Sequence, residues 1–144
     1  MEFRHSITIK RPIEFFVTFS QNEKNDMLWQ PSIIEAEKTS PGPWGVGATG
    51  REVRRFLGSK AVTIYEITEY QPGTRISMKS TSAVIPWEAT YLWEPAEEGT
   101  KWTVIYRSMP TGLLKLLAPI FDGMFRNTLV TDMGRLKQIL ETPE

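Results

Sequence analysis

The sequence predicts an α+β fold in which a curved antiparallel sheet of six to seven strands wraps around a long C-terminal helix, with two short helices after the first strand. Apolar and polar residues alternate in strand-like runs as far as residue 107. Glycine and proline separate these runs at the spacing of an antiparallel meander. From residue 111 onward, apolar residues recur instead at helical spacing.

The N-terminal part predicts a strand followed by two short helices. Apolar and polar side chains alternate over residues 3–10, the pattern of a strand with one buried face. Pro12 suits the first position of a helix to about Phe19. Ser20 or Asn22 then caps a second helix, which ends before Trp29-Gln30-Pro31 because the residue preceding a proline disfavours the helical conformation.

The middle of the chain predicts six further strands: 33–38, 51–57, 60–70, 75–81, 88–94 and 101–107. The glycine- and proline-rich segment 39–50 is a turn-rich loop. It lacks the Gly-Lys-Ser/Thr ending of a phosphate-binding loop and runs into a strand rather than a helix. No phosphate site is therefore predicted there.

The last third predicts a long amphipathic helix, with apolar residues at helical spacing from Leu113 to Leu140. Pro119 cannot sit inside a helix without losing a hydrogen bond. A short helical turn should therefore precede it, and the main helix should begin at about Pro119. Residues 142–144 are expected to form a frayed end.

Composition limits the possible functions. A chain of 144 residues predicts one domain, 1–144, with a packed core. Lys plus Arg and Asp plus Glu both number 17, so no net charge favours nucleic acid as a partner. Cysteine is absent and His5 is the single histidine, so we expect no metal, no cofactor, no disulfide and no thiol chemistry. The N-terminus lacks a signal peptide and no apolar run could span a membrane, so we expect a cytoplasmic protein without stable membrane insertion.

The predicted arrangement implies a pocket. One helix is ~10 Å across, whereas six or seven strands spaced ~4.8 Å apart span about three times that width. The sheet must curl around the helix, and bulky side chains then either fill the enclosed space or line it. The predicted ligand-binding residues are Trp29, Val53, Tyr65, Met78, Tyr91, Trp93, Phe121, Met124 and Phe125.

Several local motifs resemble those of a known superfamily. They are Ile9-Lys10-Arg11-Pro12, Trp29-Gln30-Pro31, Gly45-Val46-Gly47, Ile67-Thr68-Glu69-Tyr70-Gln71-Pro72, Glu98-Gly99-Thr100 and Asp132-Met133-Gly134-Arg135-Leu136-Lys137. In this order they resemble the SRPBCC (START-like) superfamily, especially its polyketide cyclase/dehydrase-like branch. The resemblance implies a helix-grip fold with a deep hydrophobic cavity and carries over no universal catalytic residue. The iron-binding oxygenase branch needs several histidines, which the lone His5 cannot supply.

Charged side chains offer alternatives that the sequence leaves open. His5 is interpreted as a partly exposed strand residue rather than a titrating cavity group. Asp122 and Arg126 are predicted to form a solvated i, i+4 pair, and neither Asp122 nor Asp132 is favoured as a catalytic acid. The cluster of Arg51, Arg54 and Arg55 is interpreted as an exposed edge. If one of these arginines enters the cavity, it could orient a carboxylate or an enolate.

Two further groups remain undecided from sequence. Tyr65, Tyr91 and Tyr106 either hydrogen-bond a ligand or bond to backbone and water. The leucine-rich run 113–117 either packs under the glycine- and proline-rich loop, which is favoured, or is exposed at a cavity mouth or dimer surface.

The function predicted from sequence is binding of a hydrophobic small molecule of lipid, polyketide or aromatic type between sheet and helix. The alternative is a cyclase or dehydratase acting on a polyketide-like or aromatic substrate, with no catalytic residue assigned. A homodimer or interaction module built on the leucine-rich run is a third possibility. The near absence of histidine and cysteine favours binding over catalysis.

Overall fold

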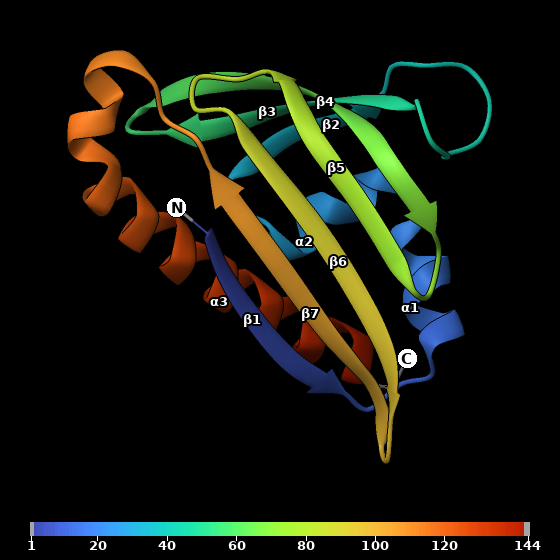
Figure 1. Ribbon diagram of the computed structural model, residues 1–144. Helices are drawn as coiled ribbons and strands as arrows, with labels where there is room; N and C mark the ends of the chain where they lie inside the picture. Colours follow the sequence, from blue (N-terminus) through green and yellow to red (C-terminus); the bar gives the residue numbers. More distant parts are fainter. Residues whose placement is uncertain (1, 143–144) are drawn as a thin grey trace.

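The computed structural model describes residues 2–142, which form a curled antiparallel sheet around a long helix (Figure 1). The described part contains seven strands in the spatial order β1-β7-β6-β5-β4-β3-β2. Their bounds are β1 Glu2–Ile9, β2 Ile33–Lys38, β3 Thr49–Phe56, β4 Ser59–Gln71, β5 Arg75–Ser82, β6 Trp87–Ala96 and β7 Gly99–Ser108. The predicted α+β helix-grip fold is confirmed.

The strand order shows which strands form the two edges of the sheet. Strands β2 to β7 follow one another as a meander, and β1 joins the far edge by pairing with β7 along its full length, from Glu2↔Arg107 to Ile9↔Thr100. The chain must therefore cross from one edge of the sheet to the other between β1 and β2. Register shifts in β2 and β4 mark bulges, which bend the strands and increase the twist.

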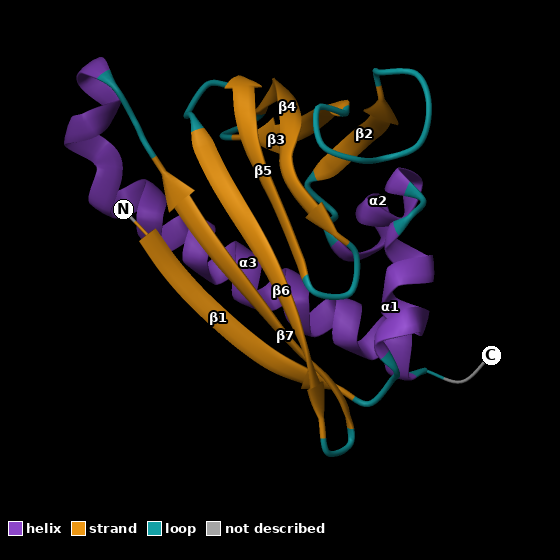
Figure 2. Ribbon diagram, turned by 45° about the vertical axis from the view of Figure 1, so that its right-hand side comes forward, coloured by secondary structure: helices purple, strands orange, loops and turns teal. Residues whose placement is uncertain are grey.

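Three short helical segments make this crossing: α1 (Ile13–Ser20), η1 (Glu23–Asn25) and α2 (Asp26–Trp29) (Figure 2). Pro12 is the N-cap of α1 rather than its first residue, with an extended backbone at φ −63° and ψ 154°. The side chain of Asn22 accepts a hydrogen bond from the Lys24 backbone N–H at 3.0 Å. The second predicted helix thus exists, divided into a 3-10 turn and one α-helical turn.

The C-terminal helix α3 spans Ala118–Glu141, with Pro119 in its first turn, and the 3-10 turn η2 (Gly112–Leu117) precedes it. The predicted break at Pro119 is confirmed. Proline has no backbone N–H and so cannot make the hydrogen bond expected inside a helix. In the first turn this N–H would have no partner in the helix anyway, so proline is tolerated there.

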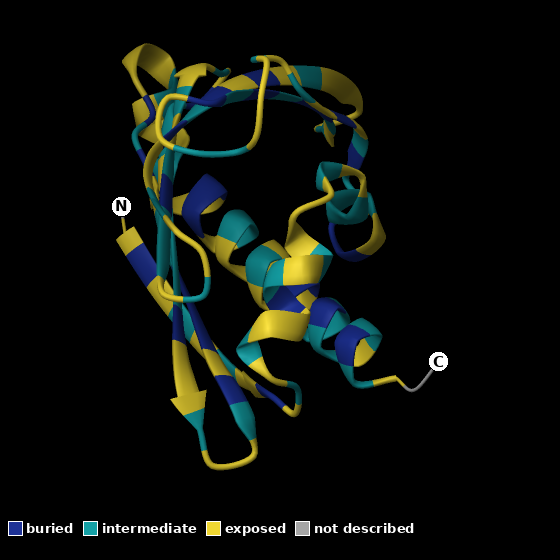
Figure 3. Ribbon diagram, turned by 90° about the vertical axis from the view of Figure 1, so that its right-hand side faces the viewer, coloured by how far each residue is buried: buried dark blue, intermediate teal, exposed yellow. Residues whose placement is uncertain are grey.

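The densest packing lies beside the C-terminal half of α3. Trp102 is fully buried, with Phe16 at 5.0 Å and Trp29 at 5.5 Å between ring centroids, both in edge-on geometry. Met133, Leu136 and Leu140 of α3 complete this cluster. Figure 3 shows buried stretches along both the sheet and α3. Edge-to-face aromatic contacts add to the hydrophobic burial, so this end of the molecule is the structural core.

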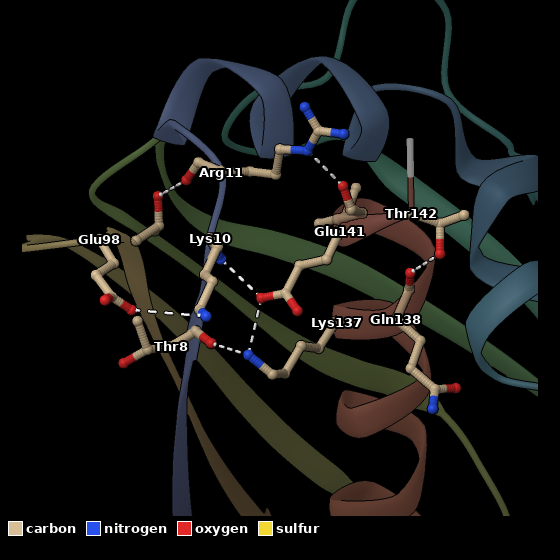
Figure 4. Close-up of polar contacts among 10 residues, drawn as sticks. Thr8, Lys10, Arg11, Glu98, Lys137, Gln138, Glu141 and Thr142 are labelled. Atoms are coloured by element: carbon tan, nitrogen blue, oxygen red, sulfur yellow. Dashed lines mark hydrogen bonds and ion pairs between the residues drawn. The ribbon is translucent and has the colours of Figure 1, made fainter. Parts of the chain in front are cut away.

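Polar contacts fasten the end of α3 to the end of β1 (Figure 4). The backbone N–H of Lys10 donates to the Glu141 carboxylate at 2.8 Å, and the Arg11 Nε donates to the Leu140 carbonyl at 2.6 Å. The Lys137 ammonium donates to the Thr8 carbonyl at 2.6 Å and to Glu141 at 2.8 Å. The C-terminal end of the helix is therefore anchored directly to the edge strand.

Replacement of Trp102 by alanine should destabilise the protein by about 3–5 kcal/mol, because it leaves a large cavity among rings that cannot collapse to fill it. Urea unfolding followed by circular dichroism measures this change. Leu113→Ala is the matched control, since Leu113 is 84% exposed and its truncation should change the free energy of unfolding by under about 0.5 kcal/mol. A loss below about 1 kcal/mol for Trp102→Ala would contradict this account of the core.

Candidate ligand-binding site

A cavity of about 430 Å³ lies between the sheet and the N-terminal half of α3. This volume falls within the range of roughly 300–1,000 Å³ that is usual for small-molecule pockets. Strands β3 to β7 and helix α3 supply mostly apolar and aromatic walls, and the α1–α2 segment supplies a polar margin. The bulky inward side chains therefore line an open space rather than filling it.

Six of the nine predicted ligand-binding residues border this cavity: Tyr65, Met78, Tyr91, Trp93, Met124 and Phe125. They come from β4, β5, β6 and α3, so four elements converge on the same space. Their contact with a ligand stays a prediction.

Trp29, Val53 and Phe121 are not among the cavity-lining residues. Trp29 packs on Trp102 in the core, and Phe121 packs against Phe125 with 6.2 Å between ring centroids. Val53 pairs with Val62 on the opposite face of the sheet, because the even-numbered residues of β3 face the cavity. Val53 therefore does not border the cavity, whereas Glu52, Arg54 and Phe56 of β3 do.

The inward charge on β3 belongs to a polar wall formed by Asp26, Gln30, Ser32, Glu52 and Arg54. The Arg54 guanidinium donates to Glu52 at 3.1 Å, to the Gln30 side-chain oxygen at 2.7 Å and to the Ser32 hydroxyl at 3.1 Å. The exposed-edge interpretation is therefore wrong for Arg54. It fits Arg51 better, whose guanidinium lies 3.5 Å from the Glu37 carboxylate.

Sequence reasoning singled out Arg54 only as one of three alternatives and missed Asp26, Gln30 and Glu52. The alternation Glu52-Val53-Arg54 was the available signal, because oppositely charged residues two apart on a strand share one face. No comparable signal marks Asp26, which reaches the wall only because α2 crosses the open edge of the sheet.

Burial controls the protonation of the polar wall. The pKa of Asp26 is raised from 3.8 to about 7, mainly by burial and also by the charge of Glu52, although Arg54 and a hydrogen bond with the Trp29 side chain lower it. Burial is the largest single effect on Arg54 and works against its charged form. The charge of Glu52, the hydrogen bond to it and the nearby Tyr106 and Tyr91 together outweigh burial and raise the Arg54 pKa. The wall thus contains a compensated ion pair beside a carboxyl group whose pKa is raised toward neutral pH.

Three tyrosine hydroxyls also border the cavity. Burial raises the pKa of Tyr106 to about 12 and the pKa values of Tyr65 and Tyr91 well above the usual range, so all three remain neutral donors. Within residues 2–142 none of these hydroxyls has a hydrogen-bond partner. Gly50 makes room for Tyr65, because a Cβ at position 50 would collide with the phenol. The phenols are available to a ligand oxygen.

Other charged residues differ from expectation. Asp122 is buried and accepts a 2.7 Å hydrogen bond from the Ser108 hydroxyl, while the Arg126 guanidinium lies 5.5 Å from the Phe3 ring centroid. The predicted solvated Asp122–Arg126 pair is therefore wrong. Asp132 borders the cavity, and burial raises its pKa although Arg135 lies 3.0 Å away. His5 is half-buried on β1 and does not border the cavity.

The leucine-rich run also differs from the favoured interpretation. Leu113 and Leu116 are 84% and 79% exposed, so they do not pack under the glycine- and proline-rich loop. Among residues 2–142, no helix is long and apolar enough to cross a membrane. The same described range contains no cluster of three or more His, Asp or Glu side chains suited to a metal ion.

Sheet, helix and cavity together define a helix-grip protein with a hydrophobic ligand-binding fold. A family profile described as polyketide cyclase/dehydrase and lipid transport matches residues 1–141. The chain therefore belongs to this family, as the resemblance of its motifs implies. No curated protein matches the sequence significantly.

Solved structures show the same fold at low sequence identity. TTHA0849 from Thermus thermophilus superposes with a TM-score of 0.82 at 17% identity, covering 97% of both chains. DR_A0006 from Deinococcus radiodurans gives 0.72 at 20% identity, covering 98% of this chain and 97% of the other. The Zhui aromatase/cyclase from Streptomyces sp. R1128 gives 0.79 at 11% identity, covering 98% and 93%.

The Asp26→Asn variant should be more stable, relative to the parent protein, at about pH 8 than at about pH 4. The raised pKa of Asp26 means that its contribution to stability is full below pH 3.8 and is lost as the pH rises to about 7. Asparagine cannot ionise, so the stability difference between variant and parent should grow by about 1–3 kcal/mol across this interval.

Urea unfolding at both pH values measures this difference. Glu97→Gln, at an exposed position between β6 and β7, controls for the change in net charge. A constant difference between Asp26→Asn and parent at all pH values would show that Asp26 is not an acid with a raised pKa.

Proposed function

We propose that this protein binds a neutral hydrophobic small molecule that carries a hydroxyl or carbonyl oxygen. The apolar body of the ligand lies against Met78, Tyr91 and Phe125, and its oxygen faces the polar wall and the tyrosine hydroxyls. The observation that carries the proposal is an open, largely apolar cavity in which Arg54 is already bonded to Glu52, while the second bordering cation, Arg55, is exposed. The fold and the family support hydrophobic ligand binding in general.

The bonding of Arg54 argues against an anionic ligand. Three protein oxygens already accept from its guanidinium, which has five N–H donors in total. A ligand carboxylate would have to displace Glu52 or lie beside it, with Asp26 and Asp132 also bordering the cavity. Like charges in a site of low dielectric repel strongly. A neutral oxygen avoids this repulsion and can accept from a phenol or donate to a carboxylate.

Competition between matched ligands tests the chemistry of the polar end. Decanol and decanoic acid differ only in the head group, and each can displace the apolar fluorescent probe N-phenyl-1-naphthylamine. At about pH 8 decanol should displace the probe at a concentration at least ~10-fold lower, a difference of about 1.4 kcal/mol. Near pH 5 the gap should narrow, because the acid becomes partly neutral.

Either of two results would overturn the proposal. Equal or stronger competition by decanoate at about pH 8 would assign Arg54 to a ligand carboxylate. Absence of probe binding, together with no change on adding either competitor, would show that the cavity does not hold hydrophobic ligands.

A cavity-filling substitution tests where binding occurs. Ala61 borders the cavity on β4, whereas the next residue, Val62, is 44% exposed and faces the other side of the sheet. Ala61→Trp should weaken probe binding at least ~10-fold, because the indole occupies the volume that the ligand needs. Val62→Trp should leave binding unchanged, with circular dichroism confirming that both variants are folded. Equal binding by the two variants would place the probe elsewhere.

Acid–base catalysis is a second candidate, and one observation favours it. Asp26 has a pKa of about 7 and borders the same cavity as Glu52. A carboxyl group that titrates near working pH suits proton transfer in a dehydration or cyclisation. In a dehydration the Asp26 carboxylate would remove the proton next to the carbonyl and then return it to the β-hydroxyl, which leaves as water while the carbon–carbon double bond forms.

A β-hydroxyacyl N-acetylcysteamine thioester tests this candidate, because dehydration creates a conjugated product with a new ultraviolet absorbance. Turnover that is lost in Asp26→Asn but retained in Glu97→Gln would establish the enzyme. A bound thioester that remains unchanged would leave binding as the function.

A further inference from the structure

Six strongly exposed apolar side chains gather at the end of the molecule opposite the anchored helix terminus. We call them the apolar rim: Leu57 at 69% exposure, Val84 at 54%, Leu113 at 84%, Leu116 at 79%, Leu117 at 44% and Ile120 at 65%. They come from three separate segments: the turn between β3 and β4, the loop between β5 and β6, and the stretch from η2 into α3.

Contacts between the three segments place them together. Phe56, beside Leu57, lies 5.8 Å from Phe121 between ring centroids, which joins the β3–β4 turn to the start of α3. The Met109 N–H donates to the Pro86 carbonyl at 2.8 Å, which joins the β5–β6 loop to the approach to η2. Leu57 and Val84 also border the cavity. Figure 1 shows the three segments at the same end of the molecule, so the rim lies at the end where Leu57 and Val84 border the cavity.

The chain segments that carry the rim contain basic residues but no acidic ones. Acidic residues are absent from 53–65, 70–87 and 99–121, although the whole chain has 17 acids and 17 bases. Arg55, Lys60 and Lys115 lie within these stretches and are exposed. None of the three forms an ion pair with any residue that the structure describes. Of the acids just outside these stretches, Asp122 is buried and bonded to Ser108, and Glu88 is exposed and lies 3.8 Å from the Arg107 guanidinium.

We propose that this end of the protein docks reversibly on the surface of a membrane that contains anionic lipid. Exposed leucine side chains enter the boundary between head groups and acyl chains, while unpaired cations interact with lipid phosphates. Exposed apolar side chains from three separate segments, with the unpaired cations Arg55, Lys60 and Lys115 beside them, fit the surface of an anionic membrane. Docking would turn this end of the cavity toward an apolar phase.

A second copy of the chain fits this surface less well. A two-fold interface pairs each patch with itself, so Arg55, Lys60 and Lys115 would face the same cations across it. Acids are missing from the rim segments, so nothing at the rim would compensate this repulsion. Anionic lipid supplies the missing negative charge.

Cosedimentation with large vesicles tests the proposal. Vesicles of phosphatidylcholine with about 30% phosphatidylserine should retain the protein at least ~10-fold better than vesicles of phosphatidylcholine alone. Raising NaCl from ~0.1 M to ~0.5 M should weaken retention, because salt screens exposed charges.

Two pairs of variants separate the apolar and charged contributions. Leu113→Asn with Leu116→Asn should reduce retention at least ~10-fold. Val46→Asn, at a 71% exposed position in the β2–β3 loop outside the rim, should not change it. Lys60→Glu with Lys115→Glu should abolish the preference for anionic vesicles, whereas Lys10→Glu with Lys101→Glu changes net charge equally and should retain it. Circular dichroism checks the fold of each variant.

Three outcomes would overturn the proposal. Equal retention on neutral and anionic vesicles would exclude the charge recognition. An equal effect of Val46→Asn and the leucine variant would exclude the rim as the contact. Absence of vesicle binding, with a solution dimer that dissociates in the leucine variant, would assign the rim to a second copy. Probe binding in the cavity is measured separately, so these results leave the proposed ligand function untouched.

Discussion

One α-helix has to cover the concave face of a seven-stranded sheet, and this mismatch in width shapes the whole molecule. The C-terminal half of α3 packs against the sheet through a buried cluster that includes Trp102, Phe16 and Trp29. Polar contacts then fix the same end of α3 to β1. Between the N-terminal half of α3 and the centre of the sheet, the side chains leave an open space, which is the cavity. One end of α3 is therefore packed into the core, and the other end borders the cavity.

The cavity combines an apolar enclosure with a small set of polar groups that are already partly satisfied. Arg54 is held by Glu52, Gln30 and Ser32, so the buried ion pair does not need a ligand to be stable. Asp26 is the group of the wall whose charge changes near neutral pH, because its pKa is raised from 3.8 to about 7, mainly by burial. The phenols add neutral donors that stay protonated at any physiological pH. In the function proposed above, these groups would recognise a neutral ligand oxygen, and the titration of Asp26 would make that recognition depend on pH.

Much of the fold could be predicted from sequence because its main signals are local. Alternation indicated the strands, Pro119 indicated the start of the last helix, and the change of period separated sheet from helix. The inward face of β3 could not be predicted, because Glu52 and Arg54 face the cavity while Val53 lies on the opposite face. Asp26 and Asp122 were missed for a related reason. Their burial depends on tertiary contacts that bring α2 against the sheet and Ser108 against α3.

Native mass spectrometry of the purified protein, followed by organic extraction and identification of the bound molecule, tests the central claim most directly. After incubation with equal amounts of decanol and decanoic acid at about pH 8, the account predicts a one-to-one complex that contains the alcohol. An unincubated sample that carries a neutral oxygenated lipid or aromatic compound would agree with it. A complex that selects the carboxylate, or a protein that takes up neither compound, would contradict it.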